Sequence, residues 1–328
     1  MKYSIQPRYS ESFRAGTKAV NDVCKILAQS GYEPFYVSYP SIYGNKITRN
    51  IKLLGDFYRL YKTIKPEDTV LIQWPQGFRN LWIFYWVIKK KCNHLQLLIH
   101  DIDILRGKHK NAKWTMRFLK MADKIIAHSQ TMKDWLVDKG FDSDKIEILT
   151  AFDYLTDDKV TDNRKKTKEV VFAGNLEKSE FLQKILETDL GLTINCYGKK
   201  IDNLSKGLNY KCAFRSENVS ALEGSWGLVW DGDSLDTCNG PMGEYQRYNS
   251  PHKLSLYIVA HLPVIVWKEA AMAQYVKEKG IGICVSSLRE ISGIIDELKE
   301  NDYKTMIENI KRESDMLRSG AHLKACLK

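Results

Sequence analysis

Short apolar runs alternate with longer amphipathic stretches along the first half of the chain. The runs span four to six residues, the usual length of a buried strand, and the stretches between them have the period of amphipathic helices. The predicted strands are Tyr3–Gln6, Phe35–Ser38, Thr69–Gln73, Leu95–His100, Lys124–His128 and Lys145–Leu149, and the predicted helices cover 14–29, 50–63, 78–90, 112–121 and 130–139. This alternation is typical of a doubly wound parallel sheet.

A second series of the same kind follows a polar segment. Residues 156–168 are charged and show no periodicity, which indicates a linker. Further strands are predicted at Glu169–Ala173, Thr193–Tyr197, Lys211–Phe214, Gly227–Trp230, Val264–Trp267 and Gly282–Val285, and a charged helix at about 302–317. The pattern predicts an α/β protein with two Rossmann-like domains, residues 1–155 and 169–328, and a cleft between them.

Composition places the chain among globular proteins that lack disulfides. Hydrophobic residues make up 44% of the 328 positions and charged residues 27%. The seven cysteines are odd in number and include no C-x-x-C pair, so we expect reduced thiols and neither a disulfide framework nor a zinc site. The first ten residues lack the apolar core of a signal peptide, and the longest apolar run is far shorter than the roughly 20 residues of a membrane span. We therefore expect a cytoplasmic location.

The formal net charge of +10 is confined to one half of the chain. Residues 1–155 contain 25 Lys and Arg against 15 Asp and Glu, whereas the remaining residues contain equal numbers of each sign. This asymmetry favours an anionic surface or substrate as the partner of the first half. The run NLWIFYWVIKKK at 80–91 suits a membrane interface, but apolar runs of this length are more often buried core helices. No helix-turn-helix, RRM or KH signature accompanies the charge, so nucleic acid is not an expected partner.

The region between Trp226 and Trp267 predicts a phosphate site. A buried strand ends in a DGD turn, a glycine-bearing loop follows, and a helix is predicted to open at Asn249/Ser250 with Pro251 in its first turn. Such a unit brings the loop and the helix N-terminus to the carboxyl edge of a parallel sheet, where Lys253 adds a positive charge. The dinucleotide, P-loop, nucleophile-elbow and zinc-protease motifs are missing from the sequence, which disfavours dehydrogenases, NTPases and those hydrolases.

Several strings of residues carry a resemblance to a known family. Residues 100–107 read HDIDILRG and residues 230–234 read WDGDS, and they are accompanied by Ala173–Leu176 and Asn249–Lys253. Together they resemble bacterial galactofuranosyltransferases of O-antigen and capsule assembly, and they are more distantly similar to the glucosyltransferases that extend GlcNAc on streptococcal adhesins. The resemblance covers nearly the whole chain. It implies the GT-B fold, in which the C-terminal domain holds a nucleotide sugar and the N-terminal domain holds the acceptor.

The donor motif departs from the pattern of the large retaining GT-B family at two positions. Leu256 stands where that family usually has a glutamate that holds the donor ribose, and His261 stands where it usually has a turn glycine. This departure disfavours a retaining enzyme. Candidate donor-binding residues are Gly174, Asn175, Lys178, Trp230, Asp231, Asp233, Tyr245, Tyr248, Asn249, Ser250 and Lys253. For several of them a structural role is an open alternative: Lys178 as a surface lysine, one of the two aspartates as a turn cap, and the tyrosines as packing residues.

The predicted strand that ends at His100 supplies candidates for the catalytic base. Asp101 and Asp103 should point the same way from an extended segment, and a like-charged neighbour raises the pKa of a carboxylate. We expect Asp101 to be the base, with Asp103 second, and Lys253 to stabilise the leaving diphosphate without a metal ion. The alternative for Asp103 is a turn cap or an ion pair with Arg106, and for His100 a satisfied core histidine. In the loop from Arg8 to Lys18, Gly16 and Lys18 are candidate contacts to phosphate or acceptor.

The family resemblance implies one preferred function, and two alternatives stand beside it. The preferred function is transfer of galactofuranose from UDP-galactofuranose to a sugar hydroxyl of a lipid-linked oligosaccharide, with inversion to a β-linkage, by a protein peripheral at the inner face of the plasma membrane. The first alternative uses UDP-glucose and a glycoprotein or glycan acceptor. The second is a non-catalytic partner subunit with the same fold. A homo-oligomer is compatible with all three.

Overall fold

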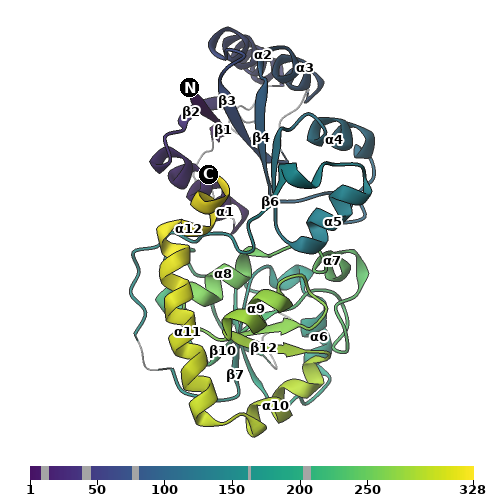
Figure 1. The fold of residues 1–328 in the computed structure, drawn as a ribbon. Helices are drawn as coiled ribbons and strands as arrows, with labels where there is room; N and C mark the ends of the chain where they lie inside the picture. Colours follow the sequence, from purple (N-terminus) through teal and green to yellow (C-terminus); the bar gives the residue numbers. More distant parts are fainter. Residues whose placement is uncertain (9–14, 39–45, 76–80, 162–163, 202–207) are drawn as a thin grey trace. The chain divides into compact units, whose positions relative to one another are not determined.

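The chain divides into two compact units of packing. The computed structural model describes residues 1–8, 15–38, 46–75, 81–161, 164–201 and 208–328. One unit comprises Met1–His128, Met132–Leu149 and Cys326–Lys328, and the other comprises Ser129–Thr131 and Thr150–Ala325 (Figure 1). The division therefore falls after Leu149 rather than at the linker that the sequence suggested, and the last three residues group with the first unit.

The first unit is built on a parallel sheet of six strands. Its sheet order is β2-β1-β3-β4-β5-β6, so β2 is added on one side of β1 and the later strands are added on the other. The strand order therefore reverses between β1 and β3. The strands are β1 (Lys2–Arg8), β2 (Glu33–Ser38), β3 (Thr69–Trp74), β4 (His94–Ile99), β5 (Lys124–Ala127) and β6 (Ile146–Ile148), and the helices are α1 (Ala15–Gln29), α2 (Lys46–Thr63), α3 (Leu81–Lys91), α4 (Ala112–Leu119) and α5 (Gln130–Asp138). Each strand and helix predicted for this half is confirmed in its described part, with ends that move by a few residues; positions 14 and 78–80 of two predicted helices fall outside the described residues.

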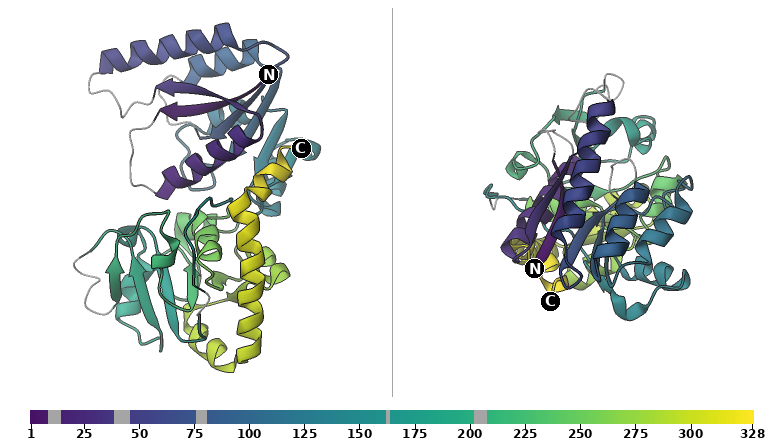
Figure 2. Two further views of the ribbon diagram at one scale, coloured as in Figure 1. Left: turned by 90° about the vertical axis from the view of Figure 1, so that its left-hand side faces the viewer. Right: turned by 90° about the horizontal axis from the view of Figure 1, so that it is seen from above.

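Helices cover both faces of this sheet. The crossover from β1 to β2 runs in one direction, and every later crossover runs in the other. Because parallel crossovers are right-handed, α1 covers one face and α2, α3 and α4 cover the opposite face. Figure 2 shows α1 and α2 on opposite sides of the strands.

The second unit has the same architecture. Its parallel sheet has the order β12-β11-β10-β7-β8-β9, so its direction reverses between β7 and β10. The strands are β7 (Glu169–Ala173), β8 (Thr193–Tyr197), β9 (Asn209–Cys212), β10 (Trp226–Val229), β11 (Val264–Trp267) and β12 (Gly282–Val285), and the helices are α6 (Phe181–Leu186), α7 (Gly240–Tyr245), α8 (His252–Val259), α9 (Ala273–Lys279), α10 (Ile291–Glu297), α11 (Glu300–Ser319) and α12 (Ala321–Cys326). The sequence did not predict the short helices α7 and α12.

The predicted linker is an extended segment that is packed against the second unit. Its described residues form no helix or strand. The Arg164 guanidinium donates hydrogen bonds to the Gly224 carbonyl at 3.0 Å and the Ala260 carbonyl at 2.9 Å. The polar composition of this segment therefore reflects exposure to solvent on the surface of the second unit, and the segment is not a flexible linker.

Tryptophan and tyrosine rings fill the core of the second unit. Trp226, Trp230 and Trp267 are almost completely buried, and the Trp226 ring meets Tyr303 of α11 at 5.1 Å between centroids. Trp226 begins β10, Trp230 directly follows it and Trp267 ends β11, so large buried side chains hold both strands in the core of this unit. No helix within the described parts of the chain is long and apolar enough to cross a membrane.

Candidate functional site

The reversal of strand order in the second unit brings two loop-bearing strand ends together. β7 and β10 are paired neighbours, yet the chain leaves them toward opposite edges of the sheet. In open α/β sheets, ligands bind outside the carboxyl ends of the strands at such a reversal. The segments that follow these two strands are Gly174–Lys178 and Trp230–Asp233, which the sequence had singled out.

Helix α8 is fixed against both strands by Tyr257. Gly227 lies in β10, and a Cβ atom there would meet the Tyr257 ring at 2.3 Å, so the helix approaches the strand more closely than any other residue would permit. The Ala173 N–H, at the end of β7, donates to the Tyr257 hydroxyl oxygen at 2.8 Å. Burial raises the pKa of Tyr257, so the hydroxyl stays protonated. One ring thereby sets the position of α8 relative to β7 and β10.

Lys253, in the first turn of α8, spans the gap between the two strand ends. Its Nζ lies 3.8 Å from Asp231 Oδ1 and 4.3 Å from the centroid of the Phe172 ring. A Cβ atom on Gly174 would lie 3.0 Å from Lys253 Cε, so the glycine leaves the space through which the lysine stem passes. The side chain is 20% exposed, which leaves its ammonium group within reach of a ligand. The arrangement provides a cation at the strand-order reversal, as an anionic ligand requires.

The two aspartates of the WDGDS turn have different roles. Asp233 accepts a hydrogen bond from the Asn239 side-chain amide at 2.5 Å, and its own N–H donates to Asn239 Oδ1 at 3.0 Å. Asp233 therefore stabilises the turn, while Asp231 faces Lys253. Gly232 has φ of +106°, and a Cβ atom there would lie 2.6 Å from the Asn239 carbonyl oxygen, so the turn requires glycine.

The segment after β7 forms a capped turn on the other side of Lys253. Asn175 Oδ1 accepts hydrogen bonds from the N–H groups of Glu177 and Lys178 at 3.1 and 3.4 Å. The asparagine thus caps a single 3-10 turn, a role the sequence did not predict, and its side chain is exposed. Lys178 is exposed at the end of this turn. Its contact to a diphosphate stays a prediction.

The loop between α7 and α8 contains buried polar atoms that lack protein partners among the described residues. These atoms are both side-chain polar atoms of Gln246, which is 1% exposed, and Asn249 Oδ1. Buried polar atoms are rarely left without a hydrogen bond in a folded protein, and bound ligand groups are one way to satisfy them. Sequence reasoning missed Gln246, because a lone glutamine in a loop carries no motif.

The aromatic candidates around this loop are mostly buried. Trp230 and Tyr245 are almost completely buried, and the indole N–H of Trp230 donates to the Ser234 carbonyl at 3.0 Å. Tyr248 is half-buried, and its carbonyl accepts a hydrogen bond from the Ser129 hydroxyl at 2.6 Å. Their burial shows that Trp230 and Tyr245 are packing residues. Part of the Tyr248 side chain is exposed.

The start of α8 differs from the prediction by one position. Pro251 is the N-cap residue and the helix begins at His252, so Pro251 precedes the first turn instead of belonging to it. Asn249 and Ser250 lie before the N-cap, and Pro251 itself provides no side-chain cap. The first backbone N–H groups of α8 give this end of the helix a partial positive charge, which favours an anion beside Lys253. Leu256 is buried within α8, and His261 adopts a positive φ of 54°, the backbone conformation that the family's usual glycine would supply.

In the first unit, the carboxyl end of β4 carries the predicted acid–base residues. Arg106 Nη1 lies 2.8 Å from Asp101 Oδ2, and Lys108 Nζ lies 3.6 Å from Asp103 Oδ1. Each carboxylate has its own cation, so the alternative in which Arg106 pairs with Asp103 is not what the structure shows, and the mutual repulsion between the carboxylates is offset. Asp101 and Asp103 are both partly exposed and flank the buried Ile102, but the segment is not extended as predicted. Asp103 lies in a turn in which the Leu105 N–H donates to the Ile102 carbonyl at 3.0 Å. Asp101 is thus an accessible carboxylate held in place by Arg106.

The other candidates of the first unit have structural partners. His100 Nε2 lies 2.7 Å from Gln73 Oε1, which agrees with a satisfied histidine. Lys18 is buried in α1 and makes an ion pair with Asp22 at 2.5 Å, so its charge is already compensated. Gly16 lies in the first turn of α1, and the part of the predicted loop at 9–14 falls outside the described residues.

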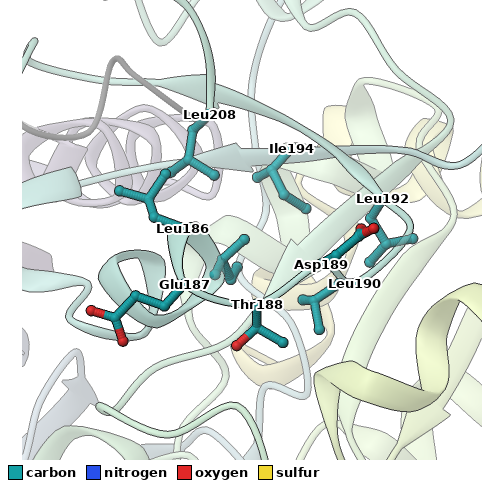
Figure 3. A pocket seen from close by; sticks show the side chains of 9 residues that line it. Leu186, Glu187, Thr188, Asp189, Leu190, Leu192, Ile194 and Leu208 are labelled. Atoms are coloured by element: carbon teal, nitrogen blue, oxygen red, sulfur yellow. The ribbon is translucent and has the colours of Figure 1, made fainter.

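A pocket of about 300 Å³ in the second unit lies away from this constellation. It is lined by apolar residues together with Glu187, Thr188 and Asp189 (Figure 3). These three residues connect the end of α6 to the start of β8, which places the pocket at the amino edge of the sheet. Within the described residues, no cluster of three or more His, Cys, Asp or Glu side chains is arranged to hold a metal ion.

Sequence comparison relates both units to one family. The N-terminal domain of the glucosyltransferase 3-like family matches residues 2–151, and its C-terminal domain matches residues 170–328. The chain is 31% identical to the β-1,6-galactofuranosyltransferase WbbI of Escherichia coli strain K12 over 320 residues, which cover 95% of this chain and 93% of the relative. It is 26% identical to glucosyltransferase 3 of Streptococcus gordonii over 336 residues, which cover 100% of this chain and 97% of that protein.

Solved structures share the fold at low sequence identity. The lipopolysaccharide outer core galactosyltransferase WaaB superposes with a TM-score of 0.60 at 12% identity, covering 100% of this chain and 99% of the other. Anabaena HepE, solved in complex with UDP and glucose, superposes with a TM-score of 0.59 at 11% identity and full coverage of both chains. Two Rossmann-like units and these neighbours establish the GT-B fold. The chain belongs to the glucosyltransferase 3-like family and is a GT-B glycosyltransferase.

Proposed function

We propose that the protein transfers galactofuranose from UDP-galactofuranose to a sugar hydroxyl of a lipid-linked oligosaccharide in O-antigen or capsule assembly, with inversion to a β-linkage. One observation carries the donor site: Lys253 Nζ lies at the strand-order reversal, beside Asp231 and above the Phe172 ring. The choice of sugar rests on the 31% identity to a β-1,6-galactofuranosyltransferase over nearly the whole of both chains.

The diphosphate of the donor fits the cationic end of the site. Lys253 and the N-terminus of α8 together offer one full positive charge and several backbone N–H groups. Gly174 allows a ligand to approach the backbone between the lysine and the end of β7. In retaining relatives a glutamate at the position of Leu256 holds the ribose. Here we assign the ribose to Asp231 and the Gln246–Asn249 loop, whose buried polar atoms lack hydrogen-bond partners among the described residues.

The proposed reaction is a single displacement. The acceptor hydroxyl gives its proton to the Asp101 carboxylate while its oxygen forms a bond to C1 of the sugar, and the bond between C1 and the β-phosphate oxygen breaks. The electron pair of that bond leaves with UDP, whose new charge is stabilised by Lys253 and the α8 N-terminus. Arg106, 2.8 Å from Asp101, orients the carboxylate. In this scheme the cation that stabilises the leaving group is a side chain, so no metal ion is required.

A second candidate keeps the site and changes the sugar. Both family matches are described as glucosyltransferase 3-like, and the S. gordonii relative at 26% identity is a glucosyltransferase. UDP-glucose is therefore the competing donor, with a glycan or glycoprotein acceptor. The same diphosphate and nucleoside occur in both donors, so Lys253 and its neighbours serve either one.

Release of UDP from a panel of nucleotide sugars tests the assignment. The purified full-length chain is incubated with UDP-galactofuranose, UDP-galactopyranose and UDP-glucose, with water or a soluble alkyl glycoside as the acceptor. We expect UDP release from UDP-galactofuranose alone. Release from UDP-glucose alone would replace the first candidate by the second, and failure of every donor, with no binding of UDP in calorimetry, would favour a non-catalytic subunit.

A further inference from the structure

Helix α2 has a second apolar stripe, on the side that faces away from the core. The residues of this stripe are Ile47, Ile51, Leu54 and Tyr58, and each is between 44% and 69% exposed. Their spacing of four, three and four positions puts them on one side of the helix. The opposite stripe, which packs on the sheet, consists of the buried Leu53, Phe57 and Leu60. A surface helix of a globular domain needs only the inner stripe, so the outer one calls for another partner.

Two neighbouring helices extend this apolar surface with exposed tryptophans. Trp82 and Trp86 lie one turn apart on α3 and are 61% and 50% exposed, and Trp114 on α4 is 49% exposed. The sequence left open whether α3 is a core helix or a membrane-facing one. One side of α3 belongs to the core, because Phe84 and Ile88 are buried, and its other side exposes the two tryptophans.

The three helices form one continuous surface. They lie on the same face of the first sheet, and α2 lies beside α3 (Figures 1 and 2). Tyr61 of α2 stacks on Trp86 of α3 at 5.7 Å, and Tyr85 of α3 meets Trp114 of α4 edge-on at 6.1 Å. We call this surface the aromatic face. It is defined by the four residues of the outer stripe together with Trp82, Trp86 and Trp114.

The aromatic face is surrounded by positive charge. The sequences of α2, α3 and α4 contain ten Lys and Arg residues and a single acidic residue, Asp56. Asp56 is buried, and it accepts a hydrogen bond from the Ser38 N–H and pairs with Arg59. Lys89 and Lys90 are exposed and follow Trp86 by one turn of α3. The field at this surface is therefore cationic.

We infer that the aromatic face docks on the surface of a bilayer that contains anionic lipids. Tryptophan and tyrosine are the side chains that favour the boundary between headgroups and acyl chains, and lysine and arginine beside them bind anionic headgroups. Lys62 lies over the Tyr58 ring at 5.7 Å and Arg117 over Trp114 at 5.6 Å, so cationic groups already lie against the rings, as they would at an interface. A second copy of the chain fits this face poorly, because pairing two copies would bring like charges together, among them the exposed Lys89 and Lys90 of both.

This inference concerns the place of action and does not depend on the identity of the donor sugar. A lipid-linked acceptor presents its sugar at a bilayer surface, so docking there would raise the local concentration of acceptor. The docking surface is formed by α2, α3 and α4 of the first unit, and the UDP site is assigned to the second unit. Loss of one activity can therefore be measured without loss of the other.

Binding to vesicles tests the inference on the full chain. Vesicles of phosphatidylcholine alone and of phosphatidylcholine with 30% phosphatidylglycerol are sedimented with wild type, with Lys89→Gln/Lys90→Gln and with Trp82→Ser/Trp86→Ser. Matched controls are Lys299→Gln/Lys304→Gln, which removes the same charge from exposed positions of the second unit, and Met242→Ser/Met316→Ser, which removes exposed apolar side chains there. Circular dichroism and UDP affinity verify that each variant is folded.

We expect wild type and both controls to bind the anionic vesicles and to be released by salt. The lysine variant should bind about 25-fold more weakly, at about fivefold for each charge removed near the surface, and the tryptophan variant should lose binding. The inference is overturned if wild type does not bind anionic vesicles, or if the controls lose as much binding as the test variants. It is also overturned if Trp82→Ser/Trp86→Ser changes the mass measured by light scattering, which would make the face an interface between copies.

Discussion

Replacement of Gly227 by alanine should disturb both the stability of the second unit and the UDP site. A Cβ atom at this position would lie 2.3 Å from Cγ of Tyr257 and 2.6 Å from its Cβ. Ordinary contacts between carbon atoms are about 3.5–4.0 Å. The close approach to Tyr257 Cβ means that a rotation of the ring cannot relieve the clash. Helix α8 itself must move away from β10 by about 1 Å.

The cost of this movement has two parts. Overpacking a well-packed core costs about 1–3 kcal/mol. The shift also weakens the bond that the buried Ala173 N–H makes with the Tyr257 hydroxyl, and an unsatisfied buried donor costs about 1–3 kcal/mol. We expect Gly227→Ala to lower the free energy of unfolding by about 2–6 kcal/mol. Because Lys253 lies on the same helix, UDP affinity should fall at the same time.

Urea denaturation followed by tryptophan fluorescence measures this change, since Trp226, Trp230 and Trp267 are buried in the second unit. The matched control is Gly293→Ala in α10 of the same unit, where a Cβ atom would meet nothing within 4 Å. Alanine inside a helix is more favourable than glycine by about 1 kcal/mol, so the control should be slightly stabilised. If Gly227→Ala unfolds at the same urea concentration as wild type and binds UDP normally, the account of how Tyr257 positions α8 is refuted.

Three further predictions concern Gly174, Asp101 and His128. Gly174→Ala should weaken UDP binding about tenfold while changing stability little, because its Cβ meets the flexible stem of Lys253 at 3.0 Å; calorimetry and urea denaturation measure both, and a normal affinity would contradict the placement of the lysine. Asp101→Asn should lower the rate of transfer about 10²–10⁴-fold and spare UDP affinity; a near-normal rate would move the base elsewhere. Burial lowers the pKa of His128 to about 4, below the ordinary value of 6.5 in the unfolded chain, so the unfolded state binds the extra proton and stability is lost as the pH falls from 6.5 to 4. Wild type should lose about 3 kcal/mol more than His128→Gln over this range, because the other titrating groups are common to both proteins, and parallel pH profiles for the two proteins would be the contrary result.

The sequence predicted the architecture well because both sheets are parallel and buried. Continuous apolar runs such as Val264–Trp267 mark such strands, and polar segments separate them. The short helices were harder. α7, Gly240–Tyr245, contains two glycines and a proline and has only six residues, so its composition indicates a loop. Its formation depends on Gly243, because a Cβ atom there would lie only 2.6 Å from the backbone of Cys238. A close contact of this kind cannot be recognised in the sequence.

The candidate site was predicted in its position and only partly in its contacts. Lys253, Gly174 and Asp231 were identified from the sequence, and the structure brings them together. The residues that position Lys253 and α8 come from distant parts of the chain. The Phe172 ring lies beneath Lys253, and the Tyr257 hydroxyl accepts a hydrogen bond from the Ala173 N–H at the end of β7. The sequence left a pair of Arg106 with Asp103 open as an alternative, because both aspartates are within range along the chain, and the turn after β4 brings Arg106 to Asp101 instead.

The central claim, that Lys253 binds the diphosphate of the donor, is tested most directly by calorimetric titration of UDP into wild type and Lys253→Met. Methionine keeps most of the stem over the Phe172 ring and removes the charge. Hydrogen bonds to charged groups contribute about 1.5–3 kcal/mol, so we predict a loss of about 10- to 150-fold in affinity. Lys304→Met, on the exposed side of α11, should bind UDP as wild type does. Equal affinity of Lys253→Met and wild type would contradict the claim.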